Sequence, residues 1–395
     1  GLFEAEAGPR QINFFPLTRH GATYRTEYKV LLASADPWFR PVDVATAPDG
    51  SVFVADWYDS GVGGHAFADQ DTGRIYRVTP AGYRSKAPKP DFATIPGLIE
   101  GLKSPCVAQQ DAARRSLIAR GDAAAPALRD LMRNGSPEET ARAVWTATAI
   151  PALSTIALEI LKSPEEFHGG DPRFREMAVR ILGRDCRENG IVEYRNEEAR
   201  KPVPALAHLD VLLPLAEDPD PGVRRELILA LRNAPTPKVA EALRTLVKGW
   251  DGKDRWYLEA LGLALQDREA EYVTSLMDPS LFGWVEADAR AEDDRVALPP
   301  YFPVDRNEAF LPAGAPEPGV SPTGKLLGFL WRMQRPESLP LLEQILPLLM
   351  SPDLQQAGDD VLRGVRSPFA ADVAALLSER TNDPGRRTVL YDLLA

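Results

Sequence analysis

The sequence is poor in the residues that build haem and metal sites. Its 395 residues include only two cysteines, Cys106 and Cys186, and four histidines. Neither cysteine belongs to a Cys-x-x-Cys-His motif, which attaches c-type haem, and the histidines are scattered rather than clustered. We therefore expect no haem and no metal site in this chain. Both cysteines lie in helical patterns, which leaves two alternatives, buried thiols or a disulfide between them.

The sequence also lacks an excess of positive charge and any long apolar run. It has 46 basic and 57 acidic residues, a net charge of −11 that is spread along the chain. This balance argues against nucleic acid or an anionic membrane as the main partner. No apolar run approaches the roughly 20 residues of a membrane-spanning helix. The first residues, GLFEAEAGPRQ, lack the regions of a signal peptide, so an export signal would have to lie outside this sequence.

Helical periodicity dominates from about residue 94 onward. In DPDPGVRRELILALRN the apolar residues Val223, Leu227 and Leu231 fall on one stripe of a helix, and TPKVAEALRTLV repeats these offsets. We expect the two helices to form an antiparallel hairpin joined by NAPTP. Ser-Pro and Asp-Pro turns recur at intervals of roughly 30 to 50 residues, the spacing of a helical solenoid. We predict stacked helix pairs over residues 94–277, with these leucines buried: Leu227, Leu231, Leu243 and Leu261.

The segment DPDPGVRRELILALRN resembles the HEAT-repeat signature, in which Asp-Pro precedes Val-Arg and a helix rich in Leu and Ala. Asp218 or Asp220 can cap the helix that starts near Pro221, and Arg224 can reach carboxylates on a neighbouring turn. The predicted fold is therefore mainly α, with HEAT-like repeats over residues 91–278. Two segments interrupt the repeats: a polar surface insertion at 187–206 and a Pro-rich acidic loop or strap at 279–323. Further helical repeats follow at 324–395.

A short all-β segment over residues 1–90 precedes the helices. Val42 and Val44, then Val52 and Val54, alternate with other residues on either side of Asp49-Gly50, which predicts a hairpin. GRIYRVTP adds a third strand, and INFFPLTRH with ATYRTEYKVLLA forms another pair. Four or five strands in all would make about one blade of a β-propeller. A single blade exposes two apolar faces and unpaired edges, so it is unstable alone.

Candidate ligand-binding residues lie in the loops between these strands: Arg40, Asp56, Trp57, Tyr58, Asp59 and His65. Arg40 could bind an acidic quinone or a substrate carboxylate, His65 could accept a proton, and Asp56 with Asp59 could ligate Ca²⁺. The alternative is structural. Trp57 would then pack between blades, the two aspartates would accept hydrogen bonds from turn amides, and Arg40 would pair with Asp43.

A second aromatic cluster lies in GWDGKDRWYLEAL, among the predicted helices. Its members are Trp250, Trp256 and Tyr257. They could form a recognition surface, but aromatic residues at the start of a solenoid helix are more often buried. We expect all three in the core.

The run ADPWFRPVDVATAPDGSVFVADWYDSGVGGH, followed by GRIYRVTPAG and by repeats containing WDGKDRWYLEALGLAL, is very similar to the PVC-type (planctomycetal) membrane-bound dehydrogenase-like proteins. The likeness is strong over residues 10–90 and continues through the repeats to residue 277. In that family a β-propeller precedes HEAT repeats and a cytochrome c domain. The resemblance implies that residues 1–90 are the terminal blade of an incomplete propeller.

The same resemblance implies a function for the parent protein. It would be periplasmic or otherwise exported, oxidise sugars or alcohols in the propeller, and pass electrons to a c-type haem outside this chain. A quinone or Ca²⁺ would also lie elsewhere. The expected partners are another polypeptide or missing segment that completes the propeller, and a cytochrome c domain. The alternative is a noncatalytic HEAT-repeat scaffold that binds proteins.

Overall fold

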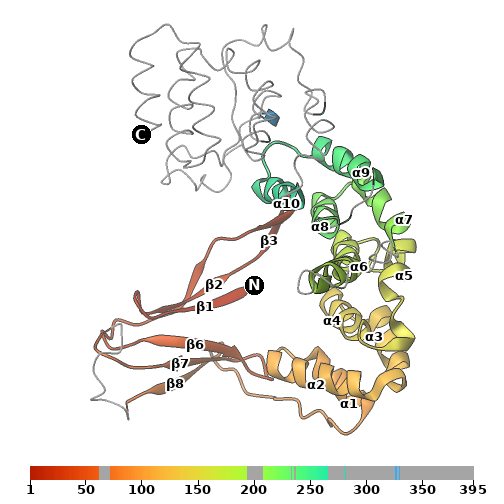
Figure 1. Ribbon diagram of the computed structural model, residues 1–395. Coiled ribbons are helices and arrows are strands. Elements are labelled where there is room, and N and C mark those ends of the chain that lie inside the picture. The colour runs from red at the N-terminus through yellow and green to blue at the C-terminus, as the bar shows by residue number, and fades with distance from the viewer. Residues whose placement is uncertain are drawn as a thin grey trace, which may run out of the picture. The chain divides into compact units, whose positions relative to one another are not determined.

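The computed structural model describes residues 1–61, 72–193, 208–232, 234 and 237–265, with isolated positions at 281, 325, 326 and 329. The chain divides into two compact units, Gly1–Ile181 and Leu182–Ala395. Small antiparallel sheets come first and helices follow, as Figure 1 shows, which confirms the predicted fold class. In the described parts of the chain, no helix is long and apolar enough to cross a membrane. The predictions for His65, for nearly all of the strap and for nearly all of residues 324–395 lie outside the described residues.

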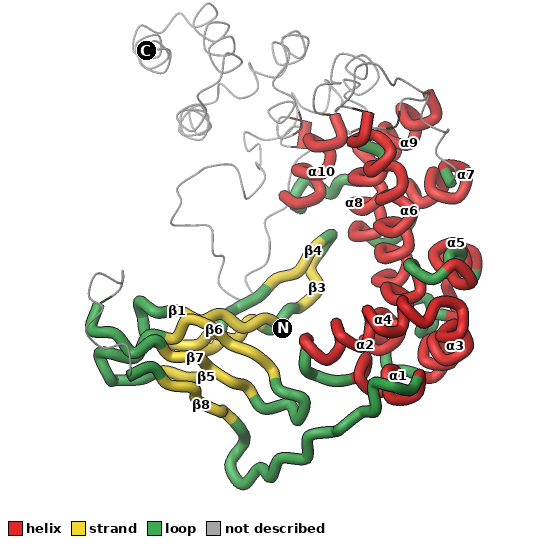
Figure 2. The backbone as a smooth tube through the Cα atoms, turned by 60° about the horizontal axis from the view of Figure 1, so that its bottom comes forward, coloured by secondary structure: helices red, strands yellow, loops and turns green. Residues whose placement is uncertain are grey.

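The β segment forms three sheets within the described residues, not the single blade that we expected. Two of the sheets are three-stranded and antiparallel, with strand orders β1-β2-β5 and β6-β7-β8, and β3 and β4 form a separate hairpin. Figure 2 draws these strands in yellow. The strands are β1 (Leu2–Glu6), β2 (Gln11–Phe15), β3 (Thr18–His20), β4 (Thr23–Arg25), β5 (Lys29–Ala33), β6 (Pro41–Thr46), β7 (Val52–Asp56) and β8 (Arg74–Val78). Sequence reasoning missed β1, because Glu4 and Glu6 dilute its apolar pattern.

The predicted hairpin around Asp49-Gly50 is confirmed. β6 and β7 pair antiparallel, with Val44 opposite Val54. Gly50 has a φ of +81°, a conformation that glycine adopts without a steric penalty. The turn is closed by a hydrogen bond from the Ala47 amide to the Ser51 carbonyl at 2.8 Å. The third predicted strand is β8, which pairs with β7.

The two three-stranded sheets share one apolar core. Ile12 of β2, Phe39 and Val54 of β7 are buried at its centre. Partly buried residues from both sheets pack around them: Phe3, Ala5, Leu32, Val44, Val52 and Val78. One face of each sheet is therefore covered by the other sheet.

Within the described residues, the helical part of the first unit consists of five α-helices of 7 to 14 residues and the beginning of a longer sixth one, which continues past Ile181 into the second unit. The helices are α1 (Ile95–Lys103), α2 (Val107–Arg120), α3 (Ala125–Asn134), α4 (Pro137–Ala147), α5 (Ile156–Lys162) and α6 (Pro172–Glu193). α1 packs against α2, and α3 against α4. Ser136 and Glu139 form a capping box at the start of α4, with Pro137 at the first helical position. α6 continues to Glu193, so the first residues of the predicted insertion at 187–206 are helical.

The second unit continues the helices with α7 (Leu209–Leu212), a 3₁₀ segment (Leu213–Glu217), α8 (Pro221–Ala230), α9 (Pro237–Lys248) and α10 (Arg255–Leu265). Leu227, Leu231, Leu243 and Leu261 are each at most 1% exposed, which confirms their predicted burial. α8 packs mainly against α10, and α9 against the 3₁₀ segment. α8 and α9 contact each other less extensively, so the predicted hairpin of these two helices is not the main packing unit.

Candidate functional site

Asp56 lies at the centre of the loop cluster that the sequence singled out. It ends β7 and is 3% exposed. Its Oδ1 accepts hydrogen bonds from the backbone amides of Arg40 at 2.7 Å and Tyr58 at 2.9 Å. Its Oδ2 is buried and has no hydrogen-bond partner. The carboxylate therefore fixes the backbone on both sides of the strand end, because two amides depend on one oxygen.

Tyr58 holds a second group of side chains together. Its φ is +56°, which is uncommon for a residue with a side chain. The Arg74 guanidinium lies over its ring, 3.5 Å from the centroid, and the Trp38 ring is 5.7 Å away. Arg74 also approaches Asp36 at 3.8 Å. Sequence reasoning missed Trp38 and Arg74, because the strand register that places Arg74 opposite Asp56 is not given by the sequence.

The structure brings Arg40, Asp56, Trp57, Tyr58 and Asp59 into one loop region, and most of their polar groups serve the backbone. Arg40 donates to the carbonyls of Phe39 at 2.9 Å and Ser60 at 3.5 Å. Asp43 instead accepts from the Val44 amide, so the expected Arg40–Asp43 pair is not formed. Asp59 accepts from the Gly61 amide at 3.1 Å. The Trp57 side chain is 57% exposed in this chain, and its packing between blades stays a prediction.

These contacts support the structural alternative for the two aspartates, since both accept hydrogen bonds from turn amides. No group of three or more His, Cys, Asp or Glu residues in the described part of the chain could hold a metal ion. The buried Arg40 Nε has no hydrogen-bond partner, like Asp56 Oδ2. Ligand binding by these residues stays a prediction.

Asp49 forms a second polar centre, at the β6–β7 turn. Its carboxylate accepts from the Ser51 hydroxyl and the Ser85 hydroxyl, each at 2.6 Å, and pairs with Arg77. The Ser51 hydroxyl, then Ser85, then the Ser51 amide lower the pKa of Asp49 far below its ordinary range. Because Ser85 lies beyond β8, this carboxylate ties the following segment to the hairpin.

A lowered pKa in the folded state means that Asp49 stabilises the fold when ionised. This contribution is complete above the ordinary aspartate pKa of about 3.9 and is lost as the pH falls toward the lowered value. We expect the protection factors of the β6 and β7 amides, which are corrected for the intrinsic exchange rate at each pH, to fall more steeply below pH ~4 in the wild type than in Asp49→Asn. Hydrogen exchange measured across this pH range checks it. Asp43→Asn, at an exposed position of β6, should keep the wild-type dependence.

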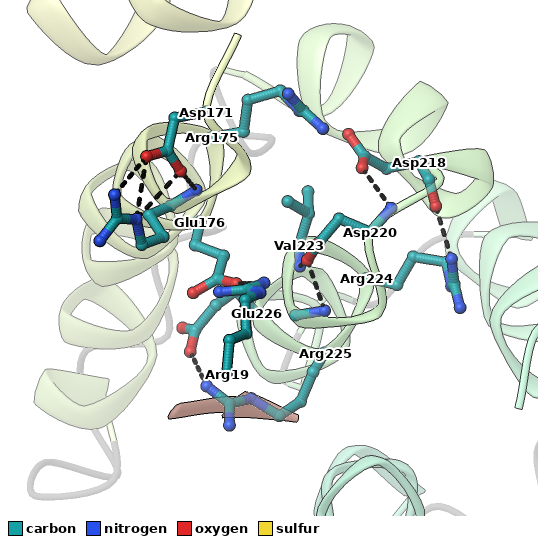
Figure 3. Close-up of polar contacts among 12 residues, drawn as sticks. Arg19, Asp171, Arg175, Glu176, Asp218, Asp220, Val223, Arg224, Arg225 and Glu226 are labelled. Atoms are coloured by element: carbon teal, nitrogen blue, oxygen red, sulfur yellow. Dashed lines mark hydrogen bonds and ion pairs between the residues drawn. The ribbon is translucent and has the colours of Figure 1, made fainter. Parts of the chain in front are cut away.

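In the helical part, Asp220 caps α8 as the sequence indicated. Its Oδ1 accepts from the amides of Gly222 at 2.8 Å and Val223 at 3.2 Å, while Asp218 accepts from the Asp220 amide (Figure 3). Arg224 does not reach a neighbouring carboxylate in these contacts. It donates instead to the backbone carbonyls of Asp218 at 2.6 Å and Gly249 at 3.2 Å. Arg224 therefore joins the start of α8 to the end of α9.

Two of the three aromatic residues of GWDGKDRWYLEAL are buried, as expected. Trp250 is 3% exposed and donates its Nε1–H to the Asp254 carbonyl at 3.0 Å. Tyr257 is 1% exposed and donates to the Leu246 carbonyl at 2.9 Å, and burial raises its pKa to about 12. Trp256 is 55% exposed, so its predicted burial is wrong. Its neighbour Arg255 lies 5.7 Å from the ring centroid.

The cysteine alternatives are resolved for Cys106 alone. It is a free, half-buried thiol at the start of α2. The alternative of a disulfide to Cys186 is therefore not realised. The side chain of Cys186 lies outside the described residues.

Comparison with known families supports the division into a β segment and helical repeats. A family model described as a domain of unknown function (DUF7133) matches residues 2–82, which contain all the described strands. A HEAT-repeat model matches residues 165–262. No curated protein matches the chain. HEAT-type solenoids present extended surfaces to other proteins, so the HEAT match indicates a scaffold or interaction role for this helical region.

Proposed function

We propose that this chain is an interaction scaffold, with HEAT repeats that bind proteins and a β segment that completes a larger β-sheet assembly. The HEAT match at residues 165–262 supports the first half. The observation that carries the second half is the exposure of large apolar side chains on the outer sheet faces. Phe53 and Ile75 lie on the outer face of the β6–β8 sheet, 37% and 76% exposed, whereas Val54 points into the shared core.

The other three-stranded sheet has a mixed outer face, on which Glu4, Gln11 and Asn13 lie beside apolar residues. Leu2 and Val30 lie on it and are 60% and 50% exposed. Apolar surface gains roughly 25 cal/mol for each Å² removed from water, so the large apolar side chains exposed on the two outer faces favour further packing. β5 and β8 are edge strands of their sheets and can add a strand. The occupant that fits is further β-sheet, from another polypeptide or from another segment of a longer product.

The likeness to the PVC-type dehydrogenase-like proteins supports a more specific assignment. In this proposal the added sheets are the remaining blades of a propeller in which a sugar or an alcohol is oxidised. Electrons then pass to a c-type haem in a cytochrome c domain, and a quinone or Ca²⁺, where used, lies outside this chain. The protein would be periplasmic or otherwise exported. Within it, this chain acts mainly as scaffold, and the alternative remains a noncatalytic HEAT-repeat scaffold.

Two measurements on native material test this proposal, one for the extent of the polypeptide and one for its activity. Intact mass of the purified protein, compared with the full reading frame, tells a fragment from a separate subunit. Reduction of an artificial electron acceptor by the native assembly, with sugars or alcohols as substrates, tests the oxidoreductase. A native assembly that contains no haem and reduces no acceptor would favour the noncatalytic scaffold.

For the chain expressed alone, we expect a folded helical part, residues 1–85 that are cleaved more readily than the helices, and concentration-dependent association through the outer sheet faces. Ile75→Lys should weaken this association, because it places a charge on the apolar face. Val107→Lys is the matched control, since Val107 is 69% exposed on α2. Sedimentation and limited proteolysis give the readouts. A monomer that resists proteolysis throughout, with amides at 40–56 exchanging as slowly as those of the helices, would show that the β segment is a self-sufficient cap.

A further inference from the structure

The β3–β4 hairpin stands apart from both three-stranded sheets. β2 and β5 pair directly, with Phe14 opposite Lys29, and residues 16–28 leave the sheet between them (Figure 2). Adjacent antiparallel strands are usually joined by about two to five residues. The connection of residues 16–28 is thus longer than the pairing of β2 with β5 requires. The extra hairpin must therefore have a role other than joining these two strands.

The hairpin is too small to be stable alone. Its strands have three residues each, and an isolated two-stranded hairpin is at best marginally stable in water. Most of its side chains are exposed: Thr18, His20, Tyr24 and Arg25. Ala22, however, lies beside Gly21 at the turn and is only 3% exposed. A buried tip on an otherwise exposed hairpin indicates that the tip is docked.

Arg19 provides a specific contact for this docking. Its guanidinium forms an ion pair with the carboxylate of Glu176 on α6, among the residues of Figure 3. The two side chains are 27% and 11% exposed, so the pair is largely shielded from water. Shielded charges depend on their partners, because a charge left alone in such a place loses its hydration without compensation. The pair joins residues far apart in the sequence, both within the first unit.

We propose that residues 16–28 form a docking arm that attaches the β segment to α6 through Arg19 and Glu176. The β segment and the helices of the first unit then move together, although residues 79–94 are their only covalent connection. The arm would then be a rigid link between the two three-stranded sheets and the first helical repeats. This link goes beyond the proposed scaffold role. It does not depend on the identity of any partner.

Hydrogen exchange and trypsin cleavage of the whole chain test the docking arm. We expect Arg19→Gln to accelerate exchange of the amides at 18–25 by about tenfold or more, since the undocked hairpin is marginal. Trypsin should also cleave this variant faster within residues 16–28. Arg115→Gln is the matched control, because it removes an exposed ion pair with Asp111 on α2 and should leave the arm unchanged.

A charge exchange gives the second test. Arg19→Glu and Glu176→Arg should each release the arm, and the double variant should recover most of the protection. Circular dichroism shows whether the helices remain intact in each variant. If a reversal unfolds them, the neutral Arg19→Gln variant decides the question by the same exchange measurement. Rapid exchange at 18–25 in the wild type, or equal exchange in the wild type and Arg19→Gln, would overturn the proposal.

Discussion

Leu227→Ala is expected to lower the free energy of unfolding of the second unit by about 3 kcal/mol. Leu227 has no exposed surface on α8, which packs against α10. Alanine removes apolar contacts and leaves a cavity that the neighbouring helices fill only in part. Hydrogen exchange at the amides of α8 and α10 measures the effect in this unit itself, since exchange reports local as well as global stability.

Leu263→Ala is the matched control for this variant. Leu263 lies on α10 and is 37% exposed, so its truncation should cost about 0.5 kcal/mol or less. Equal losses for the two leucines would mean that α8 does not pack as the stacked repeats require. A loss confined to Leu227→Ala supports a continuous core that runs through the HEAT repeats.

The helical fold was predictable because its signals are local. The Leu227 and Leu231 stripe and the Asp220 cap are each set by residues within one or two turns, and the structure confirms them. Helix pairing was less predictable. α8 packs mainly against α10, while the sequence indicated α9, because amphipathic periodicity tells which face is buried and not which neighbour buries it.

The sheets show the same limit. The period of two around Asp49-Gly50 fixed one hairpin, but it could not show that two sheets share a core around Ile12, Phe39 and Val54. The shared core changes which faces of the β segment remain exposed to water. Each sheet covers one face of the other, so the apolar side chains that stay exposed lie on the outside of a pair of sheets and not on both sides of one blade.

The candidate site was predictable in its residues but not in its geometry. Arg40, Asp56 and Tyr58 were singled out by residue type, and hydrogen bonds to the Asp56 carboxylate bring the three together. Arg74 enters the same region from β8, through a register that the sequence alone does not give. The burial of Asp56 matters most, because it makes the hydrogen bonds of this carboxylate a structural requirement.

Asp56→Ala is therefore expected to destabilise the β segment by about 3 kcal/mol. It removes the carboxylate oxygen that accepts hydrogen bonds from the Arg40 and Tyr58 amides. Asp56→Asn keeps an oxygen at the Oδ1 position and should cost only about 1 kcal/mol. Asp59→Ala, in the same loop, should cost about 0.5 kcal/mol. Exchange of the β6 and β7 amides measures all three.

The order of these three variants separates a structural role from a ligand role. A structural role needs a hydrogen-bond acceptor and not a charge. Asp56→Ala must then lose much more stability than Asp56→Asn. A carboxylate kept for a cation needs its charge, and asparagine would then abolish cation-dependent protection while leaving the apo protein stable. Protection that rises with added Ca²⁺ in the wild type, and is lost equally in Asp56→Asn and Asp59→Ala, would contradict the structural assignment. Insensitivity to Ca²⁺, together with a large gap between alanine and asparagine, would establish Asp56 as the residue that holds the end of β7 in place.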